Sequence, residues 1–201
     1  CKSCVKKCPF NAVKIINLPS EMNSDLFHRY DYNSFGLYGK PCIKQGKITG
    51  IIGENGIGKT TLIDILLGNI KPNFGIINKI PNNNEIVKYF RGSVMLNYFQ
   101  KLYNGTLKCV VKSQIIPVIN GKSGGEIQID FCEQVCNTEA DVYIFDEPSN
   151  YLDVKQRLYV SSLISNLKNH NKYVIVIDHD LSMLDYIVDE VSILFGQPSV
   201  Y

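Results

Sequence analysis

One segment constrains the fold of this chain more than any other: Gly53-Glu54-Asn55-Gly56-Ile57-Gly58-Lys59-Thr60. It fits G-x-x-x-x-G-K-[ST], a loop whose backbone N–H groups surround the phosphate oxygens of a nucleotide. The apolar run 48–52 before it predicts a buried strand, and the run 61–67 after it predicts a helix that ends at Gly68. Strand, loop and helix in this order predict a nucleoside triphosphate site; the alternative is a glycine-rich turn that binds no ligand.

The chemistry of this loop assigns roles to its residues. Glycines let backbone N–H groups approach phosphate closely, and the dipole of the following helix favours the same anion. Lys59 is expected to reach the β- and γ-phosphates, and the Thr60 hydroxyl is expected to bind Mg²⁺. The predicted nucleotide contacts in the loop are Gly53, Asn55, Gly56, Gly58, Lys59 and Thr60.

Composition excludes few classes of protein but gives no sign of a membrane segment. The 201 residues are enough for one domain with a small appendage. A net charge of +2 gives no argument for a nucleic-acid partner. No apolar stretch approaches the ~20 residues of a membrane span. An odd count of cysteines, 7, beside a nucleotide loop indicates a reducing cytosol or nucleus.

Three cysteines at the N-terminus have the spacing of iron–sulfur ligands. Cys1-x₂-Cys4-x₃-Cys8-Pro matches the latter part of C-x₂-C-x₂-C-x₃-C-P, whose last cysteine serves the other cluster in two-cluster proteins. The set is incomplete, and the alternatives are unrelated surface thiols or half of a zinc site. A polar stretch at 19–25 follows. We therefore predict the end of an iron–sulfur domain at 1–24 and a nucleotide-binding domain at 25–201.

A second apolar run, 142–145, ends in two carboxylates. It predicts a buried strand that delivers Asp146 and Glu147 to the carboxyl edge of a parallel sheet, where α/β proteins bind ligands. Asp146 is then expected to hold Mg²⁺ through water, and Glu147 to polarise the attacking water as base. The alternative is that both carboxylates cap the next helix. His179 follows another predicted strand, 173–177, and is either a contact of the γ-phosphate or a structural histidine.

Other segments complete an alternating α/β pattern. Tyr30 or Phe35 is a candidate to stack on a purine base, and the alternative is an antiparallel β-layer packed by aromatic rings. Cys132 and Cys136 share a helix face and are expected in the core rather than on a metal. The remaining predictions are helices near 156–169 and 181–188, a strand at 191–195, an asparagine-rich surface loop at 82–84, and a strand or helix within 107–118.

The order of these motifs resembles that of an ATP-binding cassette (ABC) ATPase: phosphate loop, Ser-Gly-Gly-Glu at 123–126, strand-Asp-Glu, Ser-x-x-Leu-Asp at 149–153, and strand-His. The chain is still more similar to the RNase L inhibitor family, iron–sulfur cassette ATPases that split ribosomes after termination. This closer match rests on Cys-Pro-Phe at 8–10, Asn-Leu-Pro-Ser at 17–20, His-Arg-Tyr at 28–30, Phe-Arg-Gly-Ser at 90–93, Asn-Tyr-Phe at 97–99 and Tyr-Leu-Asp-Val-Lys-Gln-Arg-Leu at 151–158.

The resemblance implies a P-loop NTPase domain of the cassette type, the first of two, behind the end of a ferredoxin-like domain with [4Fe-4S] clusters. It implies ATP and Mg²⁺ as ligands, with Thr61 joining Lys59 and Thr60 at the phosphates and metal. Glu147 becomes the catalytic base and His179 the switch histidine. The implied partners are a second nucleotide-binding domain, ribosomal subunits, and termination and initiation factors, all in the cytoplasm.

The family also implies that hydrolysis needs a second nucleotide-binding domain. Its signature, here Ser123, Gly124 and Gly125, touches the ATP held by the opposite domain, and Asp153 belongs to a loop that contacts the dimer partner. Each domain therefore owns half of each of two sites. The sequence leaves open two further hypotheses: a degenerate module that binds nucleotide without turnover, and a transporter or chromosome-associated cassette protein.

Four departures from the family pattern bear on turnover. Lys122 stands where the signature has leucine, and Ile129 stands where arginine is common. Leu96 replaces the glutamine that senses Mg²⁺ and the γ-phosphate, with Gln100 one turn away as a substitute. Only 22 residues separate Gln100 from Ser123, room for about one helix and a turn. The helical subdomain is therefore expected to be shortened, unless residues have been omitted.

Overall fold

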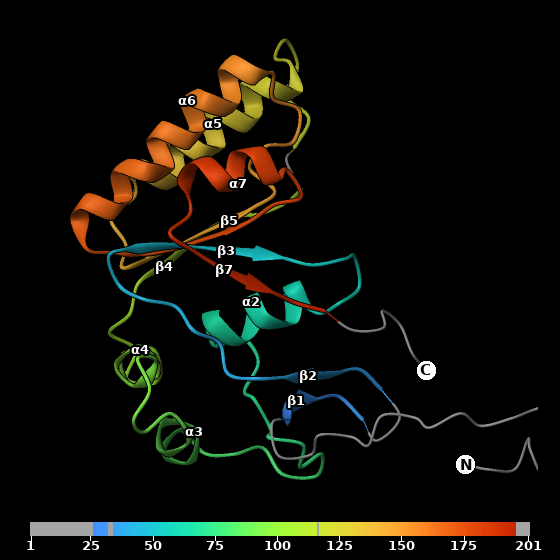
Figure 1. The fold of residues 1–201 in the computed structure, drawn as a ribbon, viewed down its shortest axis with the longest axis vertical. Coiled ribbons are helices and arrows are strands. Elements are labelled where there is room, and N and C mark those ends of the chain that lie inside the picture. The colour runs from blue at the N-terminus through green and yellow to red at the C-terminus, as the bar shows by residue number, and fades with distance from the viewer. Residues whose placement is uncertain (1–25, 32–33, 116, 196–201) are drawn as a thin grey trace, which may run out of the picture.

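A computed structural model of the chain describes residues 26–195 apart from 32, 33 and 116 (Figure 1). The predicted iron–sulfur segment 1–24, with Cys1, Cys4 and Cys8, lies outside the described residues and stays a prediction. Among the helices that the structure describes, none is long and apolar enough to cross a membrane.

The centre of the molecule is a parallel sheet with the spatial strand order β4-β5-β6-β3-β7 (Figure 1). The strands are β3 (Lys47–Ile52), β4 (Cys109–Lys112), β5 (Val142–Asp146), β6 (Tyr173–Ile177) and β7 (Glu190–Ile193). The inner strands read as continuous apolar runs because helices cover both faces of the sheet. The strands expected at 48–52, 142–145 and 173–177 are confirmed.

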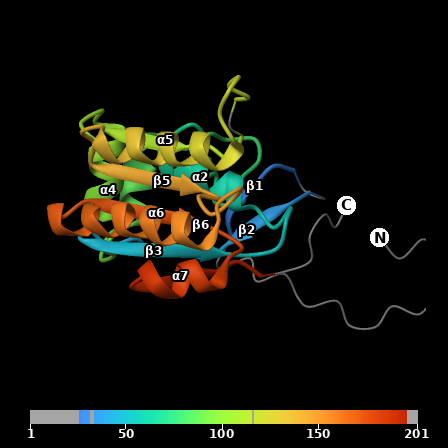
Figure 2. The same cartoon turned by 90° about the horizontal axis from the view of Figure 1, so that it is seen from above.

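Helices lie on both faces of this sheet, as Figures 1 and 2 show. On one face lie α5 (Gly124–Asn137), α6 (Val154–Asn166) with a 3₁₀ turn at Leu167–His170, and α7 (Leu181–Ile187). The opposite side carries α2 (Lys59–Leu67), α3 (Asn83–Tyr89), α4 (Leu96–Tyr103) and the antiparallel strands β1 (Leu26–Arg29) and β2 (Gly36–Tyr38). The predicted α/β architecture is confirmed.

Each face of the sheet has its own hydrophobic core. Along β5, Val142 and Ile144 point into the core that contains α2 and α4, whereas Tyr143 and Phe145 point into the core that contains α5 to α7. Cys132 is buried in this second core, and Cys136 packs against it. The prediction that Cys132 and Cys136 take part in core packing is therefore confirmed.

The asparagine run at 82–84 is not the loop that we expected. Asn82 accepts a hydrogen bond from the backbone N–H of Glu85, whose side chain in turn accepts from the backbone N–H of Asn82. This reciprocal capping box begins α3. An asparagine-rich stretch therefore starts a helix here because its side chains satisfy the free N–H groups of the first turn.

The segment before the signature contains a strand and a connection. The residues between Gln100 and Ser123 hold the end of α4, strand β4, and a link at 113–123. Within that link, residue 116 excepted, no helix is found. The strand that was one of two alternatives within 107–118 is confirmed as β4. The room estimated for about one helix and a turn is taken up by the end of α4, by β4 and by this link.

Candidate nucleotide-binding site

Four strand ends meet at one edge of the sheet. Because β3, β4, β5 and β6 are parallel neighbours, their carboxyl ends lie side by side. The phosphate loop follows β3, and Gln114 lies just beyond β4. Glu147 follows β5, and His179 follows β6 after one intervening residue. Segments far apart in the sequence therefore supply one cluster of polar side chains.

Lys59 lies inside the curve of the phosphate loop. Its ammonium donates to the backbone oxygen of Gly53 at 2.5 Å and to that of Glu54 at 3.2 Å. It lies 3.3 Å from Nε2 of His179, which connects the loop to the end of β6. The predicted lysine and histidine are thus brought together at one point, where a phosphate group of a nucleotide can reach both.

The β1–β2 layer packs on this loop. The Tyr30 hydroxyl lies 3.1 Å from Oγ1 of Thr61, and Phe35 covers Gly58 so closely that a Cβ there would fall 2.2 Å from its ring. Gly58 also has φ +103°, so glycine is required at this position on two counts. The antiparallel aromatic layer is confirmed, and both candidates for base stacking lie against the phosphate loop.

Three neighbouring side chains hold the carboxylate of Glu147. Its Oε2 accepts a hydrogen bond from Gln114 at 2.8 Å and from Asn150 at 2.6 Å, and its Oε1 lies 3.4 Å from Nε2 of His179. Its backbone has φ +48°, in the left-handed region that few non-glycine residues adopt. The surroundings therefore fix both the backbone and the carboxylate of the predicted base.

The glutamine at this site is Gln114, which the sequence analysis missed. Leu96 and Gln100, the positions considered for a sensing glutamine, both belong to α4. Gln100 lines a hollow between α3 and α4 with Asn97 and Tyr103, so that expectation is wrong. The sequence pattern that could have identified Gln114 is a polar residue just beyond a short apolar strand, here two residues after the end of β4. The same pattern identified Glu147 and His179.

Asp146 and Thr60 supply the oxygen donors that a magnesium ion prefers. Asp146 ends β5, and burial, helped by the adjacent Glu147, raises the pKa of its carboxyl group, while Lys112 and Lys59 act in the opposite direction. The exposed Thr60 lies in the first turn of α2, beside the phosphate loop. Asp146 ends β5, Thr60 lies beyond β3, and β6 separates the two strands in the sheet. A carboxylate and a hydroxyl at this edge of the sheet fit Mg²⁺ bound together with phosphate oxygens.

A buried carboxylate joins two of the loops at this edge. Asp178, 3% exposed, accepts from the backbone N–H of Ser149 at 2.9 Å and from its hydroxyl at 2.7 Å. It also accepts from the backbone N–H of Asp180 at 2.9 Å. The loops after β5 and β6, which carry Glu147 and His179, are therefore bonded to each other.

The signature and the dimer-contacting loop are neighbours. Ser123 caps α5 through a capping box with Glu126, and Asp153 caps α6 in the same way with Gln156. A Cβ on Gly125 would meet the backbone oxygen of Tyr151 at 2.9 Å, and a Cβ on Gly124 would meet the Tyr151 side chain at 3.3 Å. The two glycines allow this close packing, and they leave Ser123 and Asp153 exposed on one surface.

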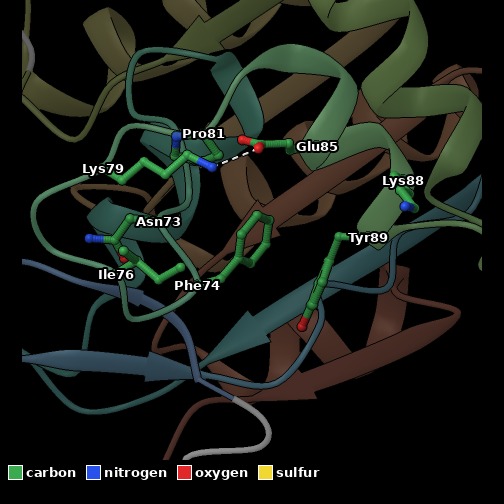
Figure 3. Close-up of a pocket in the computed structure, with 8 residues that line it drawn as sticks. All are labelled: Asn73, Phe74, Ile76, Lys79, Pro81, Glu85, Lys88 and Tyr89. Carbon is green, nitrogen blue, oxygen red and sulfur yellow. Dashed lines mark hydrogen bonds and ion pairs between the residues drawn. The ribbon is translucent and has the colours of Figure 1, made fainter.

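A separate hollow of about 370 Å³ lies between α3 and the segment 73–81 (Figure 3). Phe74 and Tyr89 form its apolar wall, with ring centroids 4.3 Å apart, and an ion pair of Lys79 with Glu85 stands at its rim. It contains no residue of the phosphate loop. The strand-end cluster, not this hollow, is the candidate nucleotide site.

The fold and the strand-end cluster define a nucleotide-binding domain of the ABC type, and comparisons with known proteins agree. The profile of the ABC transporter family matches residues 40–109. A probable metal transport system ATP-binding protein of Thermotoga maritima is 31% identical over 163 residues, which cover 71% of this chain and 67% of that protein.

Higher identity is found with ribosome-associated members of that class. Translation initiation factor RLI1 of Saccharomyces cerevisiae is 42% identical over 244 residues, covering 100% of this chain and 40% of that protein. The crystal structure of archaeal ribosome recycling factor aABCE1, in complex with ribosomal stalk protein aP1, is 34% identical with a TM-score of 0.79, covering 90% of this chain and 42% of that one. The chain belongs to the RNase L inhibitor family of cassette ATPases, and it spans about 40% of the length of these relatives.

The alignment with RLI1 also measures the shortening. It extends over 244 positions, whereas this chain has 201 residues, so about 43 aligned positions have no residue here. The chain is therefore shorter than the part of RLI1 that it matches.

Proposed function

We propose that this chain is a nucleotide-binding domain that binds ATP and hydrolyses it together with a second such domain. The observation that carries the proposal is the arrangement around Glu147, whose carboxylate is held by Gln114 and Asn150 beside His179. These are the groups that water activation next to a γ-phosphate requires.

In this proposal each group at the sheet edge has a distinct role. Lys59 and the loop N–H groups bind the phosphates, with Gly53, Asn55, Gly56 and Gly58 shaping the loop and Thr61 supporting it. Mg²⁺, held by Thr60 and Asp146, would neutralise charge on the phosphate oxygens. Glu147 takes the proton of the attacking water, and His179 and Gln114 orient the γ-phosphate and that water. Tyr30 or Phe35 stacks on the purine base.

The surface formed by the exposed Ser123 and Asp153, with Gly124 and the buried Gly125 packed against Tyr151, supports a role for a partner domain. A helix N-terminus such as that of α5 favours an anion through its dipole and free N–H groups. We infer that this surface completes the ATP site of the second domain, while the partner's equivalent completes the site built on Lys59.

We further propose that the ATPase acts in ribosome recycling in the cytoplasm, with ribosomal subunits and termination or initiation factors as partners. The relatives that support this are RLI1, described as a translation initiation factor, and aABCE1, described as a ribosome recycling factor. Cys1, Cys4 and Cys8 would then contribute to [4Fe-4S] clusters of an iron–sulfur domain that ends near residue 24.

ATP turnover by the full-length protein, with and without ribosomal subunits, tests the proposal. Glu147→Gln should abolish turnover, a loss of about 10²-fold or more, because the neutral amide cannot accept the proton, while ATP affinity stays intact. Turnover that survives this substitution would refute the assignment of the base.

A degenerate module that binds nucleotide without turnover is the second candidate. Leu96, Lys122 and the short connection between β4 and α5 favour it, because all three depart from the family pattern. Gln114 counts against it, because a glutamine does reach the Glu147 carboxylate. Tight ATP binding with no turnover by the unaltered full-length protein would decide for the module.

A further inference from the structure

Lys112, the last residue of β4, is a charged side chain buried beneath the strand-end cluster. It is 1% exposed, and the roles proposed above do not use it. Burial lowers the pKa of its ammonium group, while the nearby carboxylates of Asp146, Glu147 and Asp178 oppose that shift. A methionine of similar length would fill the same space without the cost of burying a charge.

The bonds made by Lys112 all go to the segment that carries the predicted base. Its ammonium donates to the backbone oxygen of Asp146 at 2.9 Å and to that of Glu147 at 3.2 Å. Hydrogen bonds from a charged donor are shorter and stronger than neutral ones, so two successive carbonyl groups are held in fixed directions.

Gln128, on α5, forms hydrogen bonds to the same segment. It is fully buried on α5, and its Nε2 donates to the backbone oxygens of Glu147 at 2.8 Å and of Pro148 at 3.0 Å. Three consecutive carbonyl groups, 146 to 148, therefore accept hydrogen bonds from two buried side chains. Those side chains come from the strand that leads to Gln114 and from the helix that begins after Ser123.

This double attachment accounts for the backbone of Glu147. A left-handed non-glycine residue persists only where its surroundings determine its conformation, and such residues gather at functional sites. The Glu147 carbonyl oxygen accepts hydrogen bonds from both Lys112 and Gln128, and the Glu147 N–H donates to the backbone oxygen of Ile177 at 2.7 Å. With the backbone so fixed, the carboxylate is directed toward Gln114 and His179.

We propose that Lys112 is a positioning residue for ATP hydrolysis, which with Gln128 clamps the carbonyl groups of residues 146–148 and thereby sets the direction of the Glu147 carboxylate. The inference rests on the proposed role of Glu147 as base. Lys112 is buried and bonds to backbone oxygens, so it acts through the backbone that carries Glu147.

The test is steady-state ATP turnover and equilibrium ATP binding by variants of the full-length protein. Lys112→Met should lower kcat about tenfold or more, because small misplacements of a catalytic group cost up to about 10²-fold. The Kd for ATP should stay within about twofold, since phosphate binding by Lys59 is untouched. Lys112→Arg keeps a charged donor and should recover part of kcat.

Lys108→Met is the matched control, because Lys108 is exposed and directly precedes the same strand. It should change neither kcat nor the Kd for ATP. A Lys112→Met protein that folds and keeps kcat within about twofold of the unaltered protein would overturn the inference. If thermal melts show that Lys112→Met does not fold, Gln128→Met decides: a lowered kcat supports the clamp, and an unchanged kcat overturns it.

Glu147→Gln is measured in the same series to separate the two proposals. Turnover that survives Glu147→Gln refutes the base assignment itself. Turnover abolished by Glu147→Gln but retained by Lys112→Met refutes the positioning role alone.

Discussion

The carboxyl edge of the sheet and residues 117–122 of the link are built in opposite ways. At the edge, each functional side chain is held by a neighbour from another element: Lys59 lies against His179, and Glu147 accepts from Gln114. In the link, side chains such as Val118, 93% exposed, lie in solvent. The comparison teaches that the candidate nucleotide site is built from strand ends anchored in the core, whereas residues 117–122 lie outside this cluster.

The largest expected difference between the two regions is in stability. Phe145, a completely buried residue of the strand that ends in Asp146, should cost about 3–5 kcal/mol of unfolding free energy when changed to alanine. Val118→Ala should stay within about 0.5 kcal/mol because it removes little buried surface. Urea unfolding of both variants measures this. A cost for Val118→Ala close to that of Phe145→Ala would show that the link is packed, and the comparison would fail.

A smaller difference is expected between two glycines with positive φ. Gly58→Ala meets the Phe35 ring at 2.2 Å, and strain with overpacking should cost about 2–4 kcal/mol as well as ATP affinity. Gly121, in the link, has φ +86° but open space around it, so its alanine variant should lose only about 1 kcal/mol and keep ATP affinity. Thermal melts and ATP titration of the pair measure both effects. Equal losses for the two variants would contradict the close packing of Phe35 on Gly58.

The smallest effect is expected at the end of the link. Lys122 forms an ion pair with Asp130, and both side chains are about half exposed. Such pairs contribute little to stability, and the capping box of Ser123 does not involve Lys122. Lys122→Leu, which restores the family's usual residue, should therefore leave Tm and ATP turnover without a resolvable change. A clear rise in turnover would show that Lys122 weakens the signature.

The sequence predicted the parts of the site that follow from local pattern. Lys59, Glu147 and His179 each follow an apolar strand, and a parallel sheet brings such strand ends together whatever the strand order. Gln114 was missed because its role depends on β4 lying next to β5, a long-range pairing that no local pattern specifies. Asp178 was missed for a similar reason: its partners, Ser149 and Asp180, belong to two different loops.

Two further segments, 82–84 and 107–118, show what composition leaves open: the hydrogen bonds that side chains form and the pairing of distant strands. The asparagine run at 82–84 was expected to form a loop, yet Asn82 uses its side chain to start a helix. The sequence left a strand and a helix open within 107–118, and Cys109 to Val111 form the edge strand of the sheet. Pairing with β5, a long-range contact, decides between the two.

The carboxylate of Asp178 has a consequence for how this domain can move. It bonds the loop that carries Glu147 to the loop that carries His179, and Asp180, next in that second loop, pairs with Arg157 on α6. The base, the histidine and the helix capped by Asp153 are thus linked to one another by hydrogen bonds and an ion pair. Any movement of this domain toward another domain would therefore move the base, the histidine and this helix together.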